Sequence, residues 1–340
     1  MSRPLRSLGF LTIGLFERDA PGAGHEATLA IIERAESLGF DSAWLRNRHL
    51  QYGISSPVAV LAAASQRTSR IRLGTAVIPL GYENPFRLAE DLATVDVLTG
   101  GRLEPGFSVG PPRRLDDIAP ALYPDTAEQE DFGYERLARL RRLLAGEQVS
   151  AFSGREGIEE FSERIEPHAP GLSDRLWYGA ASPDSTIWAA QNGFHLLTSS
   201  VIQSVHTHDF DTEQHAQIQL YREHHPDPAR ARVSQGLVVI PTDSATSEQR
   251  ERYVAYAHSR AARVGVPHGP RNFLFAADIV GTSEQIAETL AANRAFGDVD
   301  EVAFALPFTF EPDDYAQILE DLAGRLAPLL GWTGAANAAA

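Results

Sequence analysis

The stretch AESLGFDSAWL, residues 35–45, contains the alternation that decides the fold. It ends a predicted helix, Glu26 to Leu38, in which apolar residues recur at helical spacing. Gly39 is a typical residue just past a helix end, and Ser42 to Leu45 form a predicted buried strand. A helix followed by a short turn and an apolar strand is the repeating unit of a parallel sheet covered by helices.

The same order of elements recurs on both sides of this stretch and gives about eight strand–helix units. The other predicted strands cover residues 8–15, 71–79, 103–110, 177–181, 194–199, 233–241 and 301–307. The other predicted helices cover residues 57–66, 85–98, 134–144, 185–192, 213–224, 248–263, 284–296 and 313–330. A doubly wound sheet is the alternative, but this many units without a second domain favours an α/β fold of the (β/α)8 TIM-barrel type.

A single domain is predicted over residues 1–332, with an irregular insertion at about 111–173, after the fourth strand. Within it, Pro111 to Asp131 is rich in Pro, Asp and Arg and is predicted to be a loop. Ser150 to Ser173 is predicted to be an excursion with short strands, and residues 333–340 to be a disordered tail.

Charge and composition exclude several classes of partner and place the protein in the cytoplasm. Among 340 residues there are 30 Lys and Arg against 45 Asp and Glu, a formal net charge of −15. Such a surface repels phosphate backbones and anionic lipid, which argues against nucleic acid and membrane as partners. No stretch has the length of a transmembrane helix or the pattern of a signal peptide. Without cysteine there is neither a disulfide nor a thiolate metal site.

In a barrel of this type the active site lies at the carboxyl ends of the strands, so unusual residues there are candidates. Arg48 and His49 follow the strand that ends at Leu45, and His49 is a candidate proton donor. On this segment alone, a loop histidine bonded to a carbonyl is the favoured alternative. Ala76 and Val77, in the next strand, are small enough to let a flat ring approach the backbone, although ordinary strand packing explains them equally well.

Two further strand ends offer groups for binding an anion. Ser108 lies between Gly106 and Gly110, and Arg113 and Arg114 follow at once. Both arginines can reach a phosphate, with a solvated basic turn as the alternative.

The strand at 177–181 leads through Ala181 into a turn with Ser182 and Ser185 at the start of a helix. Hydroxyls and helix N-terminal amides form an anion site, while an ordinary helix cap uses the same groups.

Two patterns argue against other cofactors. No Gly-x-Gly-x-x-Gly follows the first strand, so a nicotinamide Rossmann site is not indicated. Close histidine pairs occur at 206 and 208 and at 224 and 225, but no carboxylate completes a metal-binding pattern. The prediction is therefore that the protein holds no metal.

The sequence resembles the bacterial luciferase-like monooxygenases, which are flavin-dependent (β/α)8 barrels. The residues that carry the resemblance are AESLGFDSAW at 35–44, SRIRLGTAV at 69–77, NPFRLAED at 84–91, DVLTGGR at 96–102 and IVGTSEQI at 279–286. The segment from Tyr178 to Gly193 is also similar to the phosphate turn and following helix of that family. The match spans the chain apart from residues 111–173 and the tail.

The resemblance implies FMN as the cofactor, with Ala76 and Val77 near its ring at a peptide that is often cis in the family. It implies that Ser182 and Ser185 hold the phosphate and that His49 lies in the active-site segment. The sequence departs from the family at residues 47–49, Asn-Arg-His, where relatives often have Glu-His-His. Arg48 is therefore a second candidate for the catalytic group.

A second departure concerns the flavin phosphate. Ser108 and Val109 stand where luciferase has a reactive cysteine and a phosphate-binding arginine, so Arg113 or Arg114 is the candidate replacement. Transient binding of reduced FMN, delivered by a separate NAD(P)H:flavin reductase, fits this departure better than tight binding of FMN.

Three functions follow from the resemblance. The first is a monooxygenase that uses reduced FMN and O2 on a small organic substrate, and the second is a dehydrogenase that uses a deazaflavin coenzyme. The third is a non-catalytic flavin-binding barrel. A homodimer is also expected, because the family commonly pairs through helices near the start of the barrel, here Pro57 to Gln66 and Pro85 to Leu98.

Overall fold

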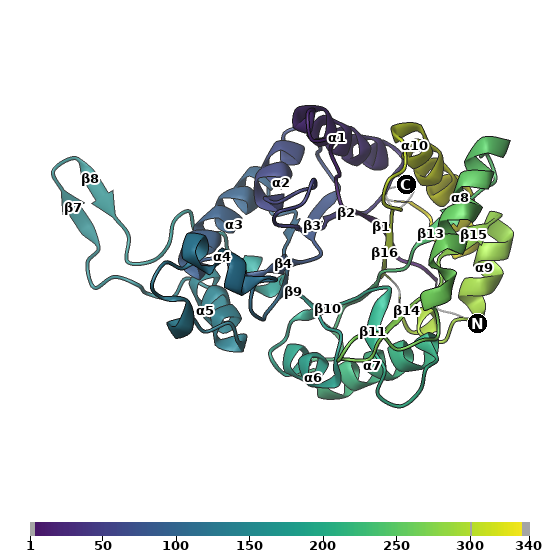
Figure 1. Ribbon diagram of the computed structural model, residues 1–340. Helices are drawn as coiled ribbons and strands as arrows, with labels where there is room; N and C mark the ends of the chain where they lie inside the picture. The colour runs from purple at the N-terminus through teal and green to yellow at the C-terminus, as the bar shows by residue number, and fades with distance from the viewer. Residues whose placement is uncertain (1–3, 300, 335–340) are drawn as a thin grey trace.

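A curled sheet of parallel strands forms the centre of the computed structural model, which describes residues 4–299 and 301–334 (Figure 1). The predicted tail lies outside the described residues from position 335 onward. The strands of this sheet are β1 (Ser7–Thr12), β2 (Ser42–Leu45), β3 (Arg72–Thr75), β4 (Ile78–Pro79), β5 (Leu103–Glu104), β6 (Gly106–Ser108), β9 (Trp177–Gly179), β10 (His195–Thr198), β12 (Val233–Gln235) and β16 (Glu301–Ala305).

The order of the strands explains the curl. It runs β4-β6-β9-β10-β12-β16-β1-β2-β3-β5, and every pairing in it is parallel. Because β3 continues into β4 and β5 into β6, the β3–β5 and β4–β6 pairings bring the two ends of this order together. The predicted α/β class and parallel sheet are confirmed.

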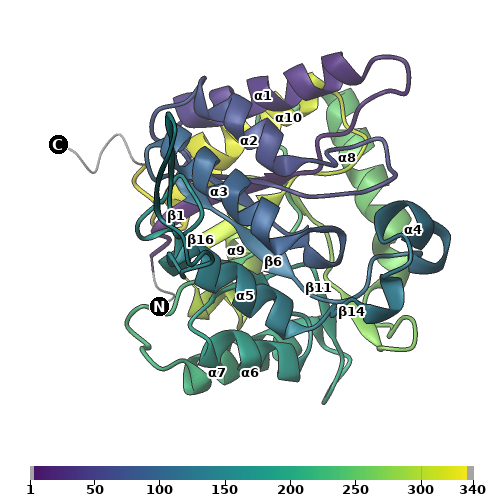
Figure 2. The same cartoon turned by 90° about the vertical axis from the view of Figure 1, so that its left-hand side faces the viewer.

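Helices surround the sheet on its outer side, as Figures 1 and 2 show. They are α1 (Pro21–Ser37), α2 (Pro57–Ser65), α3 (Pro85–Thr99), α4 (Leu115–Leu122), α5 (Tyr134–Leu144), α6 (Pro183–Gln191), α7 (Phe210–His224), α8 (Ser247–Arg260), α9 (Ser283–Ala292), α10 (Pro312–Asp321) and α11 (Ala327–Leu329). A π-helical turn, Leu322–Leu326, joins α10 to α11, so the helix predicted at 313–330 is not uniform.

Helix α3 shows how local sequence sets these boundaries. The Asn84 side chain accepts hydrogen bonds from the backbone amides of Phe86 and Arg87, which have no partner within the helix. Pro85 occupies the first turn, and Gly100 ends the helix with a left-handed backbone, φ +68°. Asn84 and Gly100 thus set the two ends of this helix.

The segment at 111–173 is more regular than predicted. The prediction of a loop from Pro111 to Asp131 was wrong, because α4 lies within it. Leu115, Ile118 and Leu122 recur at helical spacing, but Pro120 inside the helix obscured the pattern. Strands β7 (Gly154–Glu156) and β8 (Glu159–Phe161) pair in an antiparallel hairpin that projects from the body of the molecule (Figure 1).

Two small sheets were not predicted. Strand β11 (Val201–Gln203) pairs antiparallel with β14 (Phe273–Phe275), and β13 (Val239–Pro241) pairs parallel with β15 (Ile279–Gly281). The segments at 273–275 and 279–281 have only three residues each, too few to show the alternation by which strands are recognised. They bring residues of the 270s next to the ends of the central strands.

At the amino-terminal edge of the curled sheet, an ion-pair network joins distant strands. The Glu104 carboxylate accepts from Arg72 at 3.0 Å and from Arg232 at 2.8 Å, and Arg232 also donates to Glu301 at 2.6 Å. Only 3% of Glu104 is exposed. Burial alone would raise the pKa of Glu104, but the two guanidinium groups hold the pKa below its usual value.

Candidate functional site

A cavity of about 700 Å³ opens at the carboxyl-terminal edge of the curled sheet. Its wall is formed by segments that follow β2, β3, β6, β9, β10 and β16, which converge because parallel strands end at the same edge. The predicted site residues that line it are Arg48, His49, Ala76, Val77, Ser108, Arg113, Arg114 and Ala181. Ser182 and Ser185 are not part of the wall.

One part of the wall is apolar and closely packed. The peptide between Ala76 and Val77 is cis, as the resemblance implied, and it lies in the break between β3 and β4. A Cβ atom on Gly179 would lie 2.8 Å from Cγ1 of Val77, so glycine is needed for this approach. The result is an apolar surface on the wall of the cavity.

His49 lies on the wall and is only partly exposed. Its ring stacks on Tyr82 with centroids 3.8 Å apart and an angle of 16°. Its Nε2 is buried and has no hydrogen-bond partner within the described part of the chain. Burial lowers the pKa of His49, so the neutral imidazole dominates at pH 7. The alternative of a histidine fixed by a carbonyl is not what the structure contains, and this ring can turn a nitrogen toward a ligand.

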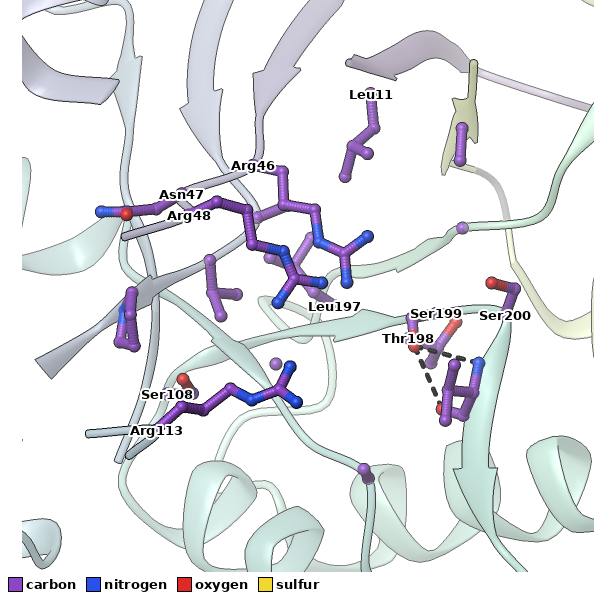
Figure 3. Close-up of a pocket in the computed structure, with 18 of the residues that line it drawn as sticks. Leu11, Arg46, Asn47, Arg48, Ser108, Arg113, Leu197, Thr198, Ser199 and Ser200 are labelled. Atoms are coloured by element: carbon purple, nitrogen blue, oxygen red, sulfur yellow. Dashed lines mark hydrogen bonds between the residues drawn. The ribbon is translucent and has the colours of Figure 1, made fainter. Parts of the chain in front are cut away.

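Arg48 and Arg113 bring two guanidinium groups into the same space (Figure 3). Burial lowers the pKa of Arg48, and the positive charge of Arg113 lowers it further. Arg113 itself is exposed at the rim, and its carbonyl accepts a hydrogen bond of 3.1 Å from the Tyr82 hydroxyl. Two like charges held together in this way form a site that is prepared for an anion.

Ser182 and Ser185 are engaged in the cap of α6. The Ser182 hydroxyl donates to Oγ of Ser185 at 2.9 Å, and the Ser185 hydroxyl also lies 2.8 Å from the Ser182 carbonyl. Their backbone and side-chain contacts form a reciprocal capping box. The turn still adjoins the cavity, because Ala180 and Ala181 belong to its wall.

Several wall residues were missed by the sequence analysis. Arg46 directly follows the strand that ends at Leu45 but was given no role, and Arg260 and Arg263 were treated as the end of a helix. Thr198, Ser199 and Ser200 at the end of β10 also line the cavity (Figure 3). Arg46 and the hydroxyl residues lie at or directly after the end of a strand, and this position in the sequence could have identified them. Nothing local in the sequence indicates that the end of α8 reaches the cavity.

The electrostatic character of the cavity is opposite to that of the whole protein. Its wall contains six arginines, at positions 46, 48, 113, 114, 260 and 263, and no aspartate or glutamate. The chain as a whole has a net charge of −15. Among the described residues, no group of three or more His, Cys, Asp or Glu side chains is arranged to hold a metal ion. The cavity therefore suits an anionic organic molecule.

A family model described as luciferase-like monooxygenase matches residues 7–300. The chain belongs to this family. Limonene 1,2-monooxygenase of Rhodococcus erythropolis is 38% identical over 137 residues, which cover 39% of this chain and 34% of that protein. The chain thus matches about a third of the length of this curated relative.

Solved structures of monooxygenases and of F420-dependent enzymes share the fold over nearly the full length. The oxygenating constituent of 3,6-diketocamphane monooxygenase from Pseudomonas putida, in complex with FMN, has a TM-score of 0.70 and 17% identity and covers 95% of this chain and 98% of its own. An F420-dependent secondary alcohol dehydrogenase in complex with an F420–acetone adduct has a TM-score of 0.62 and 15% identity, with 96% and 99% covered. The same fold thus accommodates FMN in one protein and a deazaflavin in another.

No helix among the described residues is both long and apolar enough to cross a bilayer.

Proposed function

We propose that this protein is a flavin-dependent monooxygenase that uses reduced FMN and O2 to oxidise a small organic substrate. The observation that carries the proposal is the combination, in the wall of one cavity, of the apolar residues at the cis Ala76–Val77 peptide and six arginines. The apolar surface suits a flat ring, and the arginines suit a phosphate. Arg113, which is exposed at the rim, would be the main charged anchor of the phosphate, and such an anchor suits transient binding of reduced FMN. Reduced flavin would therefore come from a separate NAD(P)H:flavin reductase.

The residues of the cavity fit FMN in type and position. Ala76 and Val77 would support the ring, and Ser108 would lie beside it. Arg113 would pair with the phosphate, close to the turn formed by Ala181, Ser182 and Ser185, whose hydroxyls would turn from the cap toward the phosphate oxygens. The buried, unpartnered Nε2 of His49 supports the proposal, because such an atom is costly to leave without a partner.

In the proposed mechanism, the bound flavin supplies the electrons that activate O2. His49, neutral at pH 7 because burial lowers its pKa, donates a hydrogen bond through one ring nitrogen to the reacting oxygen or to the substrate. Arg48 stabilises negative charge that develops nearby and is the alternative to His49 as the catalytic group. The apolar wall around Val77 and Leu197 excludes water from this region.

A deazaflavin-dependent dehydrogenase is the second candidate function. It is favoured by the excess of arginines in the cavity, because a coenzyme with a long anionic tail would use more of them than FMN. This candidate needs no O2 and no flavin reductase.

One titration separates the two candidates. The purified protein is titrated with FMN, with reduced FMN under anaerobic conditions, and with F420, while flavin absorbance and fluorescence are recorded. We expect reduced FMN to bind most tightly and O2 to be consumed when air is admitted. Tight binding of F420 without binding of reduced FMN would replace the first function by the second. Flavin binding without oxygen consumption, across a broad panel of substrates, would leave a non-catalytic flavin-binding barrel.

The same proposal includes the organisation of the chain. We propose a cytoplasmic (β/α)8 barrel of one domain over residues 1–332, in which residues 111–173 form an insertion after the fourth strand. We also propose a homodimer that pairs through α2 and α3, where Phe86, Val97 and Leu98 are exposed apolar side chains. Light scattering that gave a mass near 37.1 kDa would contradict the dimer.

A further inference from the structure

The cavity carries more positive charge than the phosphate of FMN can balance. Within the described chain, Arg46, Arg48 and Arg113 have no carboxylate partner, whereas Arg114 pairs with Asp117 at 2.6 Å. Arg260 and Arg263 share a single carboxylate, that of Asp278, at 2.5 and 3.9 Å. Two carboxylates therefore face six guanidinium groups, and a phosphate adds about two negative charges. A substantial positive charge is left for a second anion.

Arg113 and Arg46 lie on segments of the wall that follow different strands. Arg113 follows β6, which pairs with β9, the strand that leads into the cap of α6. Arg46 follows β2, and the aromatic residue Phe308 follows β16. Strands β16, β1 and β2 are consecutive neighbours in the sheet, and β2 is separated from β6 by the strand formed by β3 and β4. The surface at Ala76 and Val77, after β3, adjoins the β2 side.

The Phe308 ring lies close to both Arg46 and Arg260. The guanidinium carbon of Arg46 lies 5.8 Å from the centre of its ring, and that of Arg260 lies 5.3 Å from the same centre. Arg263 lies 4.5 Å from the ring centre of Phe275, which is also part of the wall. Aromatic faces under guanidinium groups keep these groups extended and leave their N–H donors available. The arrangement places guanidinium groups beside the apolar faces of two aromatic rings.

We propose that Arg46, Arg260 and Phe308 form a binding subsite for the carboxylate of the substrate, so that the enzyme acts on an organic carboxylate with an apolar or aromatic body. The proposal rests on the proposed function, since it assigns the Arg113 side of the cavity to the flavin phosphate. A guanidinium recognises a carboxylate through two parallel N–H donors, and the Arg46 guanidinium, which lines the cavity, has no carboxylate partner among the described residues. Arg260 adds a second donor beside it, while Asp278 keeps its side chain in place.

The test compares two probes with the same aromatic ring, benzoate, which carries a carboxylate, and benzamide, which carries a neutral carboxamide. Their binding to the FMN-loaded protein is measured by titration calorimetry. Benzoate is expected to bind at least tenfold more tightly than benzamide. Arg46→Gln should remove this preference but change FMN affinity less than twofold, and Arg46→Lys, which keeps the charge, should retain part of it. Arg34→Gln is the control, because Arg34 pairs with Glu320 on the surface and does not line the cavity, and it should alter the binding of neither ligand.

Several outcomes would overturn the proposal. Equal affinity for the two probes, or no binding of benzoate, would show that the wall does not select a carboxylate. A tenfold loss of FMN or F420 affinity in Arg46→Gln would assign this arginine to the coenzyme instead. Circular dichroism and thermal melting of each variant separate these outcomes from a loss of folding. If the wild-type protein binds no flavin, the proposed function fails, but the comparison of benzoate with benzamide is then made without flavin and keeps its meaning.

Discussion

Two clusters of arginines lie at opposite edges of the same curled sheet, and their surroundings differ. At the amino-terminal edge, Arg72 and Arg232 are paired with the carboxylates of Glu104 and Glu301 at 2.6 to 3.0 Å. At the carboxyl-terminal edge, arginines such as Arg48 line a cavity whose wall contains no carboxylate. The positive charges of the first cluster are balanced by carboxylates of the protein, whereas those of the second cluster are not fully balanced.

This difference separates a structural use of arginine from a functional one. A buried guanidinium whose charge is balanced within the protein fixes the positions of strands, and removing its partner damages folding. A guanidinium without a partner adds repulsion to the folded state, which is tolerated where a ligand supplies the missing charge. Substitutions at the two edges should therefore affect different properties, stability at one edge and binding at the other.

The largest expected effect on stability is at the balanced edge. Glu104→Gln leaves two partly buried guanidinium groups without the buried carboxylate that they share and should lower the free energy of unfolding at pH 7 by about 3–5 kcal/mol. Urea denaturation followed by circular dichroism measures this loss. Glu320→Gln is the control, because Glu320 pairs with Arg34 on the surface, and it should cost less than about 1 kcal/mol. Equal losses in the two variants would contradict the distinction between the clusters.

The same variant predicts a pH dependence. The two guanidinium groups hold the pKa of Glu104 below its unfolded value of 4.5, although burial opposes them. Its contribution to stability is then complete above that value and disappears as the pH falls through the lower folded pKa. The difference in stability between the wild type and Glu104→Gln should therefore be constant near neutral pH and shrink below about pH 4.5.

The second expected effect is on catalysis at the cavity. His49→Ala should reduce turnover by about 10²–10⁴-fold and leave folding intact, because the ring is partly exposed and packs mainly on Tyr82. Since burial lowers the pKa of His49 and the neutral ring is the proposed donor, wild-type turnover should fall as the pH decreases below 6.5. Arg48→Ala is the competing variant. Full turnover in His49→Ala, with loss of turnover in Arg48→Ala, would assign the catalytic role to Arg48.

The sequence was sufficient to predict the parallel sheet and the strand ends at which part of this cavity lies. Regular helix–strand alternation depends on local spacing, and the carboxyl ends of parallel strands must converge, so Arg48, Ala76 and Ser108 were placed correctly without a structure. Arg260 was not found, because it lies on a helix and reaches the cavity only through the packing of α8 against Phe308. Helix α4 was missed because Pro120 is normally a helix breaker.

A smaller effect is expected for flavin binding at the rim. Arg113→Gln should weaken FMN by about tenfold, which corresponds to the loss of one charge-assisted contact at an exposed position. The free energy of unfolding should stay the same or rise slightly, because the repulsion between Arg113 and Arg48 is removed. Fluorescence titration with FMN, at low and at high salt, measures the contact. An unchanged FMN affinity would move the phosphate away from Arg113.

The smallest expected effect is at the cap of α6, a turn whose hydroxyls are assigned both to stability and to flavin binding. In the double variant Ser182→Ala with Ser185→Ala, the capping box is lost, which should lower the free energy of unfolding of the flavin-free protein by about 1 kcal/mol. If the hydroxyls also turn toward the phosphate, FMN binding must weaken as well, and saturating FMN should then stabilise the variant less than the wild type. Thermal melting with and without FMN gives both quantities in one experiment. A variant that loses stability equally in the presence and absence of FMN would restrict Ser182 and Ser185 to capping, and would leave Arg113 as the anchor of the phosphate.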